Sequence, residues 1–374
     1  VGMLFLNKDE ALAAESRRIV EEELENETLF VVGWREVPTN PDVLGEIALS
    51  SLPRIEQIFV NAPAGWRPRD MERRLYMARR RIEKRISESN GPDKDFYVCS
   101  FSNVVNIYKG LCMPADLPRF YLDLADLRLE SAICLFHQRF STNTVPRWRL
   151  AQPFRYLAHN GEINTIAGNR QWARARAYKF KTPLIPDLQD ASPFVNETGS
   201  DSSSLDNMLE LFLSGGMDLL RAMRLLVPPA WQQNPDMDND LRSFFDFNSM
   251  HMEPWDGPAG IVMSDGRYAA CTLDRNGLRP ARYVITKDKL ITCASEVGIW
   301  AYQPDEVVEK GRVGPGELMV IDTRSGKIHH SAETDNDLKS RHPYKEWMEK
   351  NVQRLVPFED LPEDLGGKRE MDDA

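Results

Sequence analysis

Residues 261–273 read IVMSDGRYAACTL, two apolar runs that are joined by the dipeptide Asp265-Gly266. Asp-Gly between apolar runs is a strong short-range signal for a β-hairpin, because both residues tolerate the backbone conformations of the tightest turns. Similar strand pairs are expected on the C-terminal side, at residues 282–286 with 290–294 and at residues 317–322 with 327–330. Together these pairs predict an antiparallel meander.

The region before this hairpin alternates strand and helix patterns. Residues 1–6 have the composition of a buried strand, and strand patterns follow at residues 28–37 and 54–60. Residues 9–26 and a segment beginning near Pro68 carry apolar side chains at helical spacing. Helices that alternate with antiparallel strands predict layered α+β packing rather than a doubly wound parallel sheet.

The middle of the chain continues this alternation. We expect strands at residues 96–107, 131–138 and 155–159, the last ended by a turn at Asn160-Gly161, and helices at residues 164–180, 205–213 and 219–227. Asp201 lies in the polar run GSDSSS directly before one of these helices, which is the position of an N-cap.

Composition and charge indicate a cytoplasmic protein that does not bind nucleic acid. The chain has 374 residues and a net charge of −10, and no run of 18 apolar residues that would cross a membrane. The helix after Pro68 has a strongly basic face. We interpret it as a solvated helix face, and the alternative is a docking surface for an acidic partner or RNA. The basic residues of this face are Arg73, Arg74, Arg79, Arg80, Arg81, Lys84 and Arg85.

The cysteines and histidines predict neither a metal site nor an obvious nucleophile. The five cysteines include no C-x-x-C pair, and the six histidines form no metal-binding motif. Cys134 is expected to pack in the core of its strand. The other four cysteines lie in apolar strand or turn contexts without an adjacent base: Cys99, Cys112, Cys271 and Cys293.

Four polar clusters follow expected strand ends, where functional groups are common. They read HQRFSTNT at residues 137–144, LAHNGEINT at 157–165, GSDSSSLDN at 199–207 and DRNGLRP at 274–280.

The residue types in these clusters suit a pocket for a free α-amino acid beside an acyl-transfer centre. Arg139 offers a rigid fork for a carboxylate, and Asp201 could accept from an ammonium group. Asn160 and Gly161 offer a side-chain amide and a backbone N–H for a developing oxyanion. The structural alternatives are a buried ion pair for Arg139, a plain turn for Asn160 and Gly161, and a helix cap for Asp201.

In this order and spacing, the four clusters resemble the class II glutamine amidotransferase domain of glutamate synthases, in particular the large (alpha) subunit of the NADPH-dependent type. The resemblance covers nearly the whole chain. It includes WREVP at residues 34–38, PAGWRP at 63–68, YKGL at 108–111 and MEPWDGPA at 252–259.

The resemblance implies an N-terminal-nucleophile (Ntn) fold, an αββα four-layer sandwich, and hydrolysis of L-glutamine to glutamate and ammonia. Asn160 and Gly161 would form the oxyanion hole. Arg139 would bind the substrate α-carboxylate and Asp201 its α-amino group, while Phe140 and Thr142 would line the pocket. In the full enzyme the ammonia is added to 2-oxoglutarate with FMN and an iron–sulfur cluster, and no cofactor or metal belongs to this segment. The implied partners are the remaining synthase domains and an NADPH-oxidising small subunit.

One departure from the family concerns the nucleophile, which in these enzymes is an N-terminal cysteine whose own α-amine serves as the base. The chain begins with Val1, so we expect a fold that is incomplete at its N-terminus and a polypeptide that is inactive alone. We assign residues 1–340 to the amidotransferase domain and 341–374 to a C-terminal helix and linker. The alternatives are a phosphoribosyl-diphosphate-dependent amidotransferase, a non-catalytic amino-acid-binding or scaffold module, and an RNA-binding module.

Overall fold

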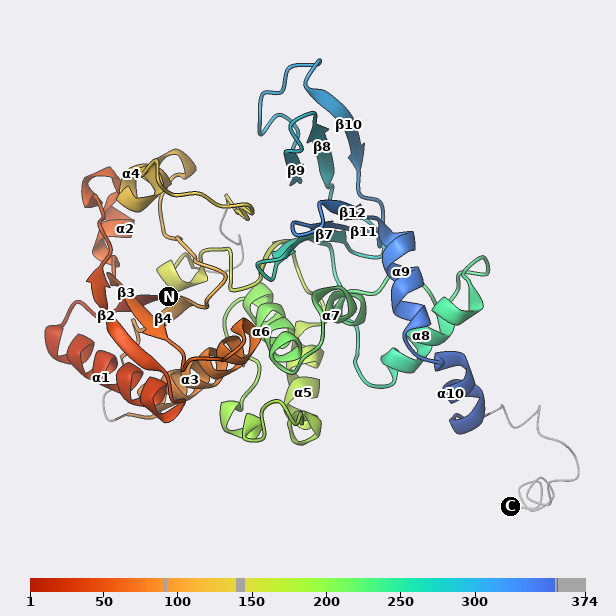
Figure 1. Ribbon diagram of the computed structural model, residues 1–374, viewed down its shortest axis with the longest axis horizontal. Helices are drawn as coiled ribbons and strands as arrows, with labels where there is room; N and C mark the ends of the chain where they lie inside the picture. The colour runs from red at the N-terminus through yellow and green to blue at the C-terminus, as the bar shows by residue number, and fades with distance from the viewer. Residues whose placement is uncertain (90–92, 139–144, 354, 356–374) are drawn as a thin grey trace, which may run out of the picture.

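The computed structural model describes residues 1–89, 93–138, 145–353 and 355. Within them are three antiparallel sheets, and helices cover the two larger ones (Figure 1). The N-terminal sheet has the strand order β2-β3-β1-β4. Its strands are β1 (Gly2–Leu6), β2 (Phe30–Glu36), β3 (Arg54–Asn61) and β4 (Tyr97–Phe101).

Helices α1 (Glu10–Asn26) and α3 (Pro68–Glu88) cover one face of this sheet. Asp9 caps α1, because its carboxylate accepts from the Leu12 N–H at 3.1 Å. Alternate residues of β1 point to opposite faces: Leu4 packs with the helices, whereas Phe5 packs under Trp148. The short helices α2 (Glu46–Ser50) and α4 (Leu117–Phe120) lie on that second side.

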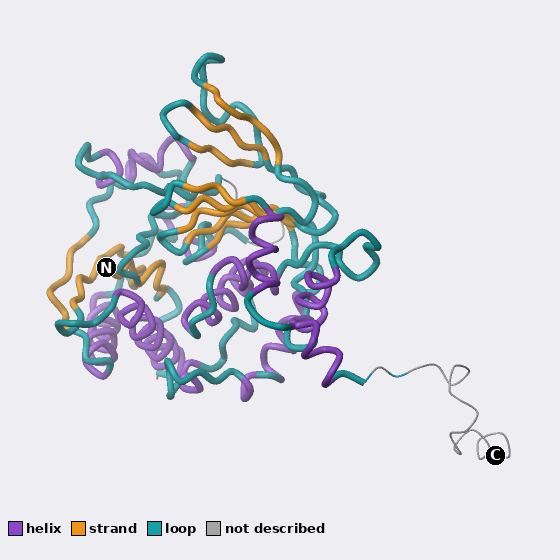
Figure 2. The backbone as a smooth tube through the Cα atoms, turned by 45° about the vertical axis from the view of Figure 1, so that its right-hand side comes forward, coloured by secondary structure: helices purple, strands orange, loops and turns teal. Residues whose placement is uncertain are grey.

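The five-stranded sheet has the order β12-β11-β7-β6-β5, so β5 is an edge strand. Helices α6 (Asp201–Ser214) and α7 (Leu219–Leu226) cover one of its faces, and a smaller sheet of order β10-β8-β9 covers the other (Figure 2). The strands are β5 (Leu157–Gly161), β6 (Ala259–Ser264), β7 (Tyr268–Leu273), β8 (Arg282–Thr286), β9 (Ile291–Ala294), β10 (Val307–Arg312), β11 (Leu318–Asp322) and β12 (Lys327–His329).

The predicted α+β class and the predicted hairpins are confirmed. Residues 261–273 form the β6–β7 hairpin, and the β8–β9 and β11–β12 pairs follow as expected. Sheet-on-sheet packing occurs between the five-stranded and three-stranded sheets. The two larger sheets meet through their helices, because Tyr76 and Met77 of α3 pack in the same core cluster as Met208 of α6.

The remaining helices are α5 (Ile166–Ala175), α8 (Asn239–Ser249), α9 (Ser331–Ser340) and α10 (Tyr344–Asn351). The last three pack around Phe244, Leu338 and Tyr344. No helix in the described part of the chain is both long and apolar enough to cross a membrane. Short 3-10 helices occur at Pro41–Val43, Pro114–Asp116, Leu122–Ala125, Trp148–Leu150, Ala177–Lys179 and Leu188–Ala191.

Several local predictions are wrong. Residues 131–138 form no strand, and Cys134 among them is exposed rather than packed in the core. Asn160 and Gly161 do not make a hairpin turn, because both are paired with β6 inside β5. Strand β10 and helix α8 were not expected from the sequence. An apolar run forms a strand only where a partner strand is available, and whether one is available depends on the tertiary structure.

The arginines on the basic face of α3 are not freely solvated, which corrects the sequence interpretation; of the seven basic residues on this face, Lys84 alone is exposed. Arg79 is only 1% exposed, and it binds Glu83 at 2.7 Å within α3 and Glu210 of α6. Arg74 and Arg81 both bind Glu27, which follows α1. The arginines therefore lie between acidic residues of other elements, and these partners are too distant in sequence to be recognised from the helix itself.

Candidate functional site

Asn160 and Gly161 end strand β5, opposite Gly260 and Ala259 of β6. Gly161 has a φ of +147°, and a Cβ atom built on it would lie 1.7 Å from the carbonyl oxygen of Pro258. Only glycine fits this position, because the backbone conformation and the approach of Pro258 both exclude a side chain. The absence of a side chain at Gly161 was expected to let a ligand approach closely. In the structure it lets the Pro258 backbone approach closely.

The segment before β6 packs on the turn after β5. The Glu162 N–H donates to the Pro258 carbonyl at 2.9 Å. The Asp256 N–H donates to the Thr165 hydroxyl at 3.0 Å, and the Thr165 N–H donates back to the Asp256 carbonyl. The motifs at residues 157–165 and 252–259 are thus one structural unit.

The open edge of β5 presents the N–H groups of its odd-numbered residues. The Glu162 N–H is bonded to Pro258, directly before β6, and bonding alternates along an antiparallel strand. The N–H groups of residues 157, 159 and 161, and of residue 163 just after β5, therefore point away from β6. Leu157 donates to the Asp206 carboxylate at 3.2 Å, His159 to the Gln152 amide oxygen at 2.7 Å and Ile163 to the Asp201 carboxylate at 2.8 Å. The N–H of Gly161 lies between these occupied positions.

Asp201 is the first residue of α6, whereas Ser200 occupies the N-cap position without a side-chain cap. The predicted N-cap role is therefore wrong by one residue. The Asp201 carboxylate still lies at the positive end of the helix, where it accepts from the Ser202 N–H at 2.6 Å. Because it also accepts from Ile163, Asp201 lies at the same corner of the molecule as Asn160 and Gly161.

His159 and Ser202 belong to this corner and were not singled out from the sequence. The His159 ring is 2% exposed, and its Nδ1 lies 2.8 Å from the Ser202 hydroxyl. Burial lowers the pKa of His159, and the nearby Asp201 carboxylate opposes that effect. Their positions beside Asn160 and Asp201 in the two clusters were the available signal.

Asp274, from the fourth cluster, supports the strand opposite Gly161. Its buried carboxylate accepts from the backbone N–H groups of Ala259 and Asn276, each at 3.0 Å, and of Leu278 at 3.2 Å. Ala259 is the register partner of Gly161. The fourth cluster therefore positions the site through the backbone.

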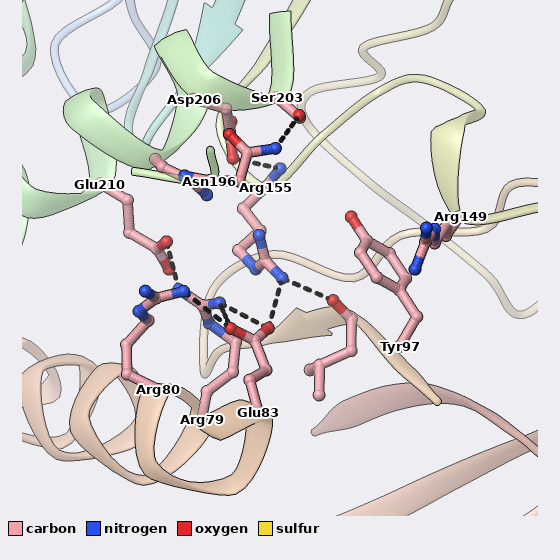
Figure 3. A network of polar contacts seen from close by, with 12 residues as sticks. Arg79, Arg80, Glu83, Tyr97, Arg149, Arg155, Asn196, Ser203, Asp206 and Glu210 are labelled. Carbon is pink, nitrogen blue, oxygen red and sulfur yellow. Dashed lines mark hydrogen bonds and ion pairs between the residues drawn. The ribbon is translucent and has the colours of Figure 1, made fainter. Parts of the chain in front are cut away.

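A buried ionic network joins β5 and α6 to α3 (Figure 3). The Asp206 carboxylate accepts from the N–H groups of Arg155, Tyr156 and Leu157 at 3.2, 2.8 and 3.2 Å. The Arg155 guanidinium in turn donates to Glu83 of α3 at 3.1 Å and to the Val98 carbonyl of β4 at 2.8 Å. The network therefore holds the start of β5 against α6 on one side and against α3 and β4 on the other.

The pKa values of Asp206 and Glu83, two carboxyl groups of this network, are shifted in opposite directions. Burial raises the pKa of Asp206 to about 6, since its partners do not fully offset the loss of water. Burial also acts on Glu83, but the positive charges of Arg79, Arg155 and Arg80 outweigh it and lower its pKa to about 2.

The remaining predicted site residues come from the cluster at residues 137–144. Arg139, Phe140 and Thr142 lie outside the described residues. Within the described part, no group of three or more His, Cys, Asp or Glu side chains could hold a metal ion. A cavity of about 320 Å³ adjoins the residues that support the site, because Asp256 and Asp274 line it, but Asn160, Gly161 and Asp201 do not. Its other lining residues include Pro229, Trp231, Phe245, Trp255 and Arg275.

Comparison with known proteins identifies the class. The chain belongs to the class-II glutamine amidotransferases, whose family model matches residues 1–347. It is 43% identical over 360 residues to the ferredoxin-dependent glutamate synthase of Cyanidium caldarium, covering 96% of this chain and 23% of that one. It is 39% identical over 360 residues to the NADPH glutamate synthase large chain of Bacillus subtilis, with the same coverage. The chain thus spans about a quarter of the length of these relatives.

Solved structures were also compared. The glutamine phosphoribosylpyrophosphate amidotransferase from B. subtilis matches with 16% identity and a TM-score of 0.27, covering 46% of this chain and 28% of that one. A class-II domain protein from Silicibacter pomeroyi matches with 17% identity and a TM-score of 0.26, covering 46% of this chain and 65% of that one.

Proposed function

We propose that this chain is the ammonia-generating domain of a glutamate synthase, which hydrolyses L-glutamine to glutamate and ammonia. The observation that carries the proposal is the open edge of β5. There the Gly161 N–H lies between two N–H groups that are bonded to Gln152 and Asp201. This arrangement suits an oxyanion at Gly161 and an α-ammonium group at Asp201.

In this proposal each residue has one task. The Asn160 amide and the Gly161 N–H stabilise the negative charge that develops on the carboxamide oxygen during acyl transfer. Asp201 binds the α-ammonium group. Arg139 binds the α-carboxylate, and Phe140 and Thr142 line the pocket; these three roles rest on the family resemblance alone.

We infer that none of the five cysteines is the nucleophile. Burial raises the pKa of Cys99 to about 12, and contact with Cys293 together with burial raises the pKa of Cys271. Burial also raises the pKa of Cys112 to about 11. Such thiols carry little thiolate at neutral pH. The hydrogen bond with Cys271 lowers the pKa of Cys293, but Cys293 lies on β9, in the sheet that covers the face opposite α6 and Asp201. The 374-residue polypeptide is therefore expected to be inactive alone. A glutaminase assay on the purified chain tests this, and turnover that an internal Cys→Ser variant abolishes would contradict it.

The next proposals concern a whole glutamate synthase, because this chain spans about a quarter of the length of its glutamate synthase relatives. We propose that the ammonia passes to a synthase region of the same subunit and is added to 2-oxoglutarate, with FMN and an iron–sulfur cluster as cofactors. An NADPH-oxidising small subunit would supply the electrons. We propose that the whole protein is located in the cytoplasm. Residues 1–340 would form the amidotransferase domain and residues 341–374 the helix and linker toward the next domain.

Binding of the reaction product tests the site independently of turnover. Calorimetry or NMR titration with L-glutamate is expected to detect binding to the chain, weakened about tenfold or more in Asp201→Asn, which cannot balance the ammonium charge. Asp240→Asn, an exposed change on α8, is the matched control. Equal binding by wild type and Asp201→Asn would contradict the assigned role.

A second candidate is a non-catalytic amino-acid-binding or scaffold module, which the raised thiol pKa values favour. It predicts the same binding of L-glutamate. It is distinguished by adding a peptide or protein segment that begins with cysteine: the amidotransferase proposal expects glutaminase activity to appear, and the binding module does not.

A further inference from the structure

A chain of hydrogen bonds, with a buried contact between His159 and Ser202 at its centre, connects the two parts of the proposed amino-acid site. The Gln152 side chain brackets the backbone of His159, accepting from its N–H at 2.7 Å and donating to its carbonyl at 3.1 Å. The His159 ring then reaches α6, where Nδ1 lies 2.8 Å from the Ser202 hydroxyl. That hydroxyl lies 3.2 Å from the Asp201 carboxylate.

The direction of these hydrogen bonds follows from the number of available protons. A carboxylate only accepts, so the Ser202 hydroxyl is the donor in its contact with Asp201. With the hydroxyl proton there, the Ser202 oxygen accepts from Nδ1–H of His159; in the other tautomer Nδ1 accepts from Ser202 and Nε2–H is directed to the Pro258 carbonyl. The ring edge at Nε2 faces Gly161, because a Cβ atom built on Gly161 would lie 3.0 Å from that nitrogen.

These contacts fix the orientation of the Asp201 carboxylate. One oxygen, Oδ1, accepts from the N–H and hydroxyl of Ser202 and from the Ser200 hydroxyl at 3.4 Å, and the other, Oδ2, accepts from the N–H of Ile163. A carboxylate oxygen has two acceptor positions, and Ile163 occupies one of those on Oδ2, so one position on Oδ2 remains for a ligand. Without the hydroxyl, the carboxylate would have more freedom to rotate and the buried Nδ1 of His159 would lose its hydrogen-bond partner.

We propose that Gln152, His159 and Ser202 are positioning residues that orient Asp201 toward an α-ammonium group while they hold Gly161 at the adjoining oxyanion position. This inference rests on the proposed function. It assigns Ser202 a role in selecting amino acids over dicarboxylates, although Ser202 itself need not touch the ligand.

The deciding experiment compares two ligands that differ in the ammonium group. L-glutamate carries it and glutarate lacks it, while both carry two carboxylates. Ser202→Ala is expected to weaken L-glutamate binding about fivefold or more and to change glutarate binding less than about twofold. Ser203→Ala is the matched control on the same helical turn, because its hydroxyl donates to the Ser200 carbonyl and not to Asp201.

Variants of His159 provide the second arm. The side-chain amide of Asn can present a donor at the place of Nδ1, so His159→Asn is expected to retain ligand preference within about threefold, whereas His159→Leu loses it. Thermal unfolding identifies any variant that fails to fold, and if His159→Leu does so, Ser202→Ala decides.

The outcomes separate the two proposals. Equal weakening of both ligands by Ser202→Ala, or no weakening of either, overturns the inference while wild-type binding of L-glutamate leaves the proposed function intact. A wild-type chain that binds glutarate as tightly as L-glutamate overturns the role of Asp201, and with it both proposals.

Discussion

Gly161 and Pro258 approach each other so closely that a Cβ atom on Gly161 would lie 1.7 Å from the Pro258 carbonyl oxygen. That carbonyl also accepts from the Glu162 N–H, so it cannot move aside without losing a hydrogen bond. We therefore expect Gly161→Ala to lower the free energy of unfolding by about 3 kcal/mol, through steric overlap and the positive φ. Urea unfolding measures this change.

Gly168→Ala is the control for that substitution. Gly168 is exposed in helix α5, with no atom within 4 Å of an added Cβ. Alanine should stabilise the helix there by about 0.5–1 kcal/mol. If the two variants have the same stability, the close approach of Gly161 and Pro258 does not exist in solution.

Asp206 should make stability depend on pH. Burial raises its pKa from 3.8 to about 6, so the folded chain holds this proton more tightly than the unfolded chain. The contribution is fully present below about pH 4 and is lost as pH rises through about 6. Two pKa units correspond to about 3 kcal/mol.

Asp206→Asn tests this sign directly. The variant cannot titrate, so the change in unfolding free energy between about pH 4 and pH 7 should be smaller than in wild type by up to about 3 kcal/mol. The exposed Asp240→Asn variant should keep the wild-type slope. An unchanged slope in Asp206→Asn would show that this carboxyl is ionised throughout the range.

Arg79→Met should strongly destabilise the chain. Arg79 binds Glu83 and Glu210, and Glu210 is only 5% exposed, so removing the guanidinium leaves a buried carboxylate without its main partner. Breaking a buried pair in this way costs about 3–5 kcal/mol. Lys84→Met, at an exposed position of the same helix, should change stability by less than about 0.5 kcal/mol. Comparable losses in both variants would restore the interpretation of a solvated face.

The cysteines should differ in their reaction with alkylating reagents. Cys134 is exposed, whereas Cys99 and Cys271 are buried with raised pKa values. Peptide mapping after iodoacetamide treatment of the native chain should find Cys134 modified first, and Cys99 and Cys271 modified only in urea. Early modification of Cys99 would contradict its burial.

The local elements were predictable where nearby residues carry the signal. Asp265-Gly266 between apolar runs predicted the β6–β7 hairpin, and the Pro68 helix begins at that residue. Cap chemistry was predicted less accurately, because Asp201 and Ser200 are both plausible caps and lie one residue apart. The strand predicted at residues 131–138 does not form, because an apolar run carries no information about whether a neighbouring strand is present.

The α+β class, the hairpins, the family resemblance and the candidate roles of Asn160, Gly161 and Asp201 all follow from the order of the residues alone. Three other features become visible only in the folded chain: Asp201 bonds to Ile163, Asp206 holds the start of β5, and Arg79 pairs with Glu210, 131 residues away. Short-range signals depend on neighbours within a few residues. Hydrogen bonds and buried ion pairs depend on distances in space, which exist only once the chain has folded.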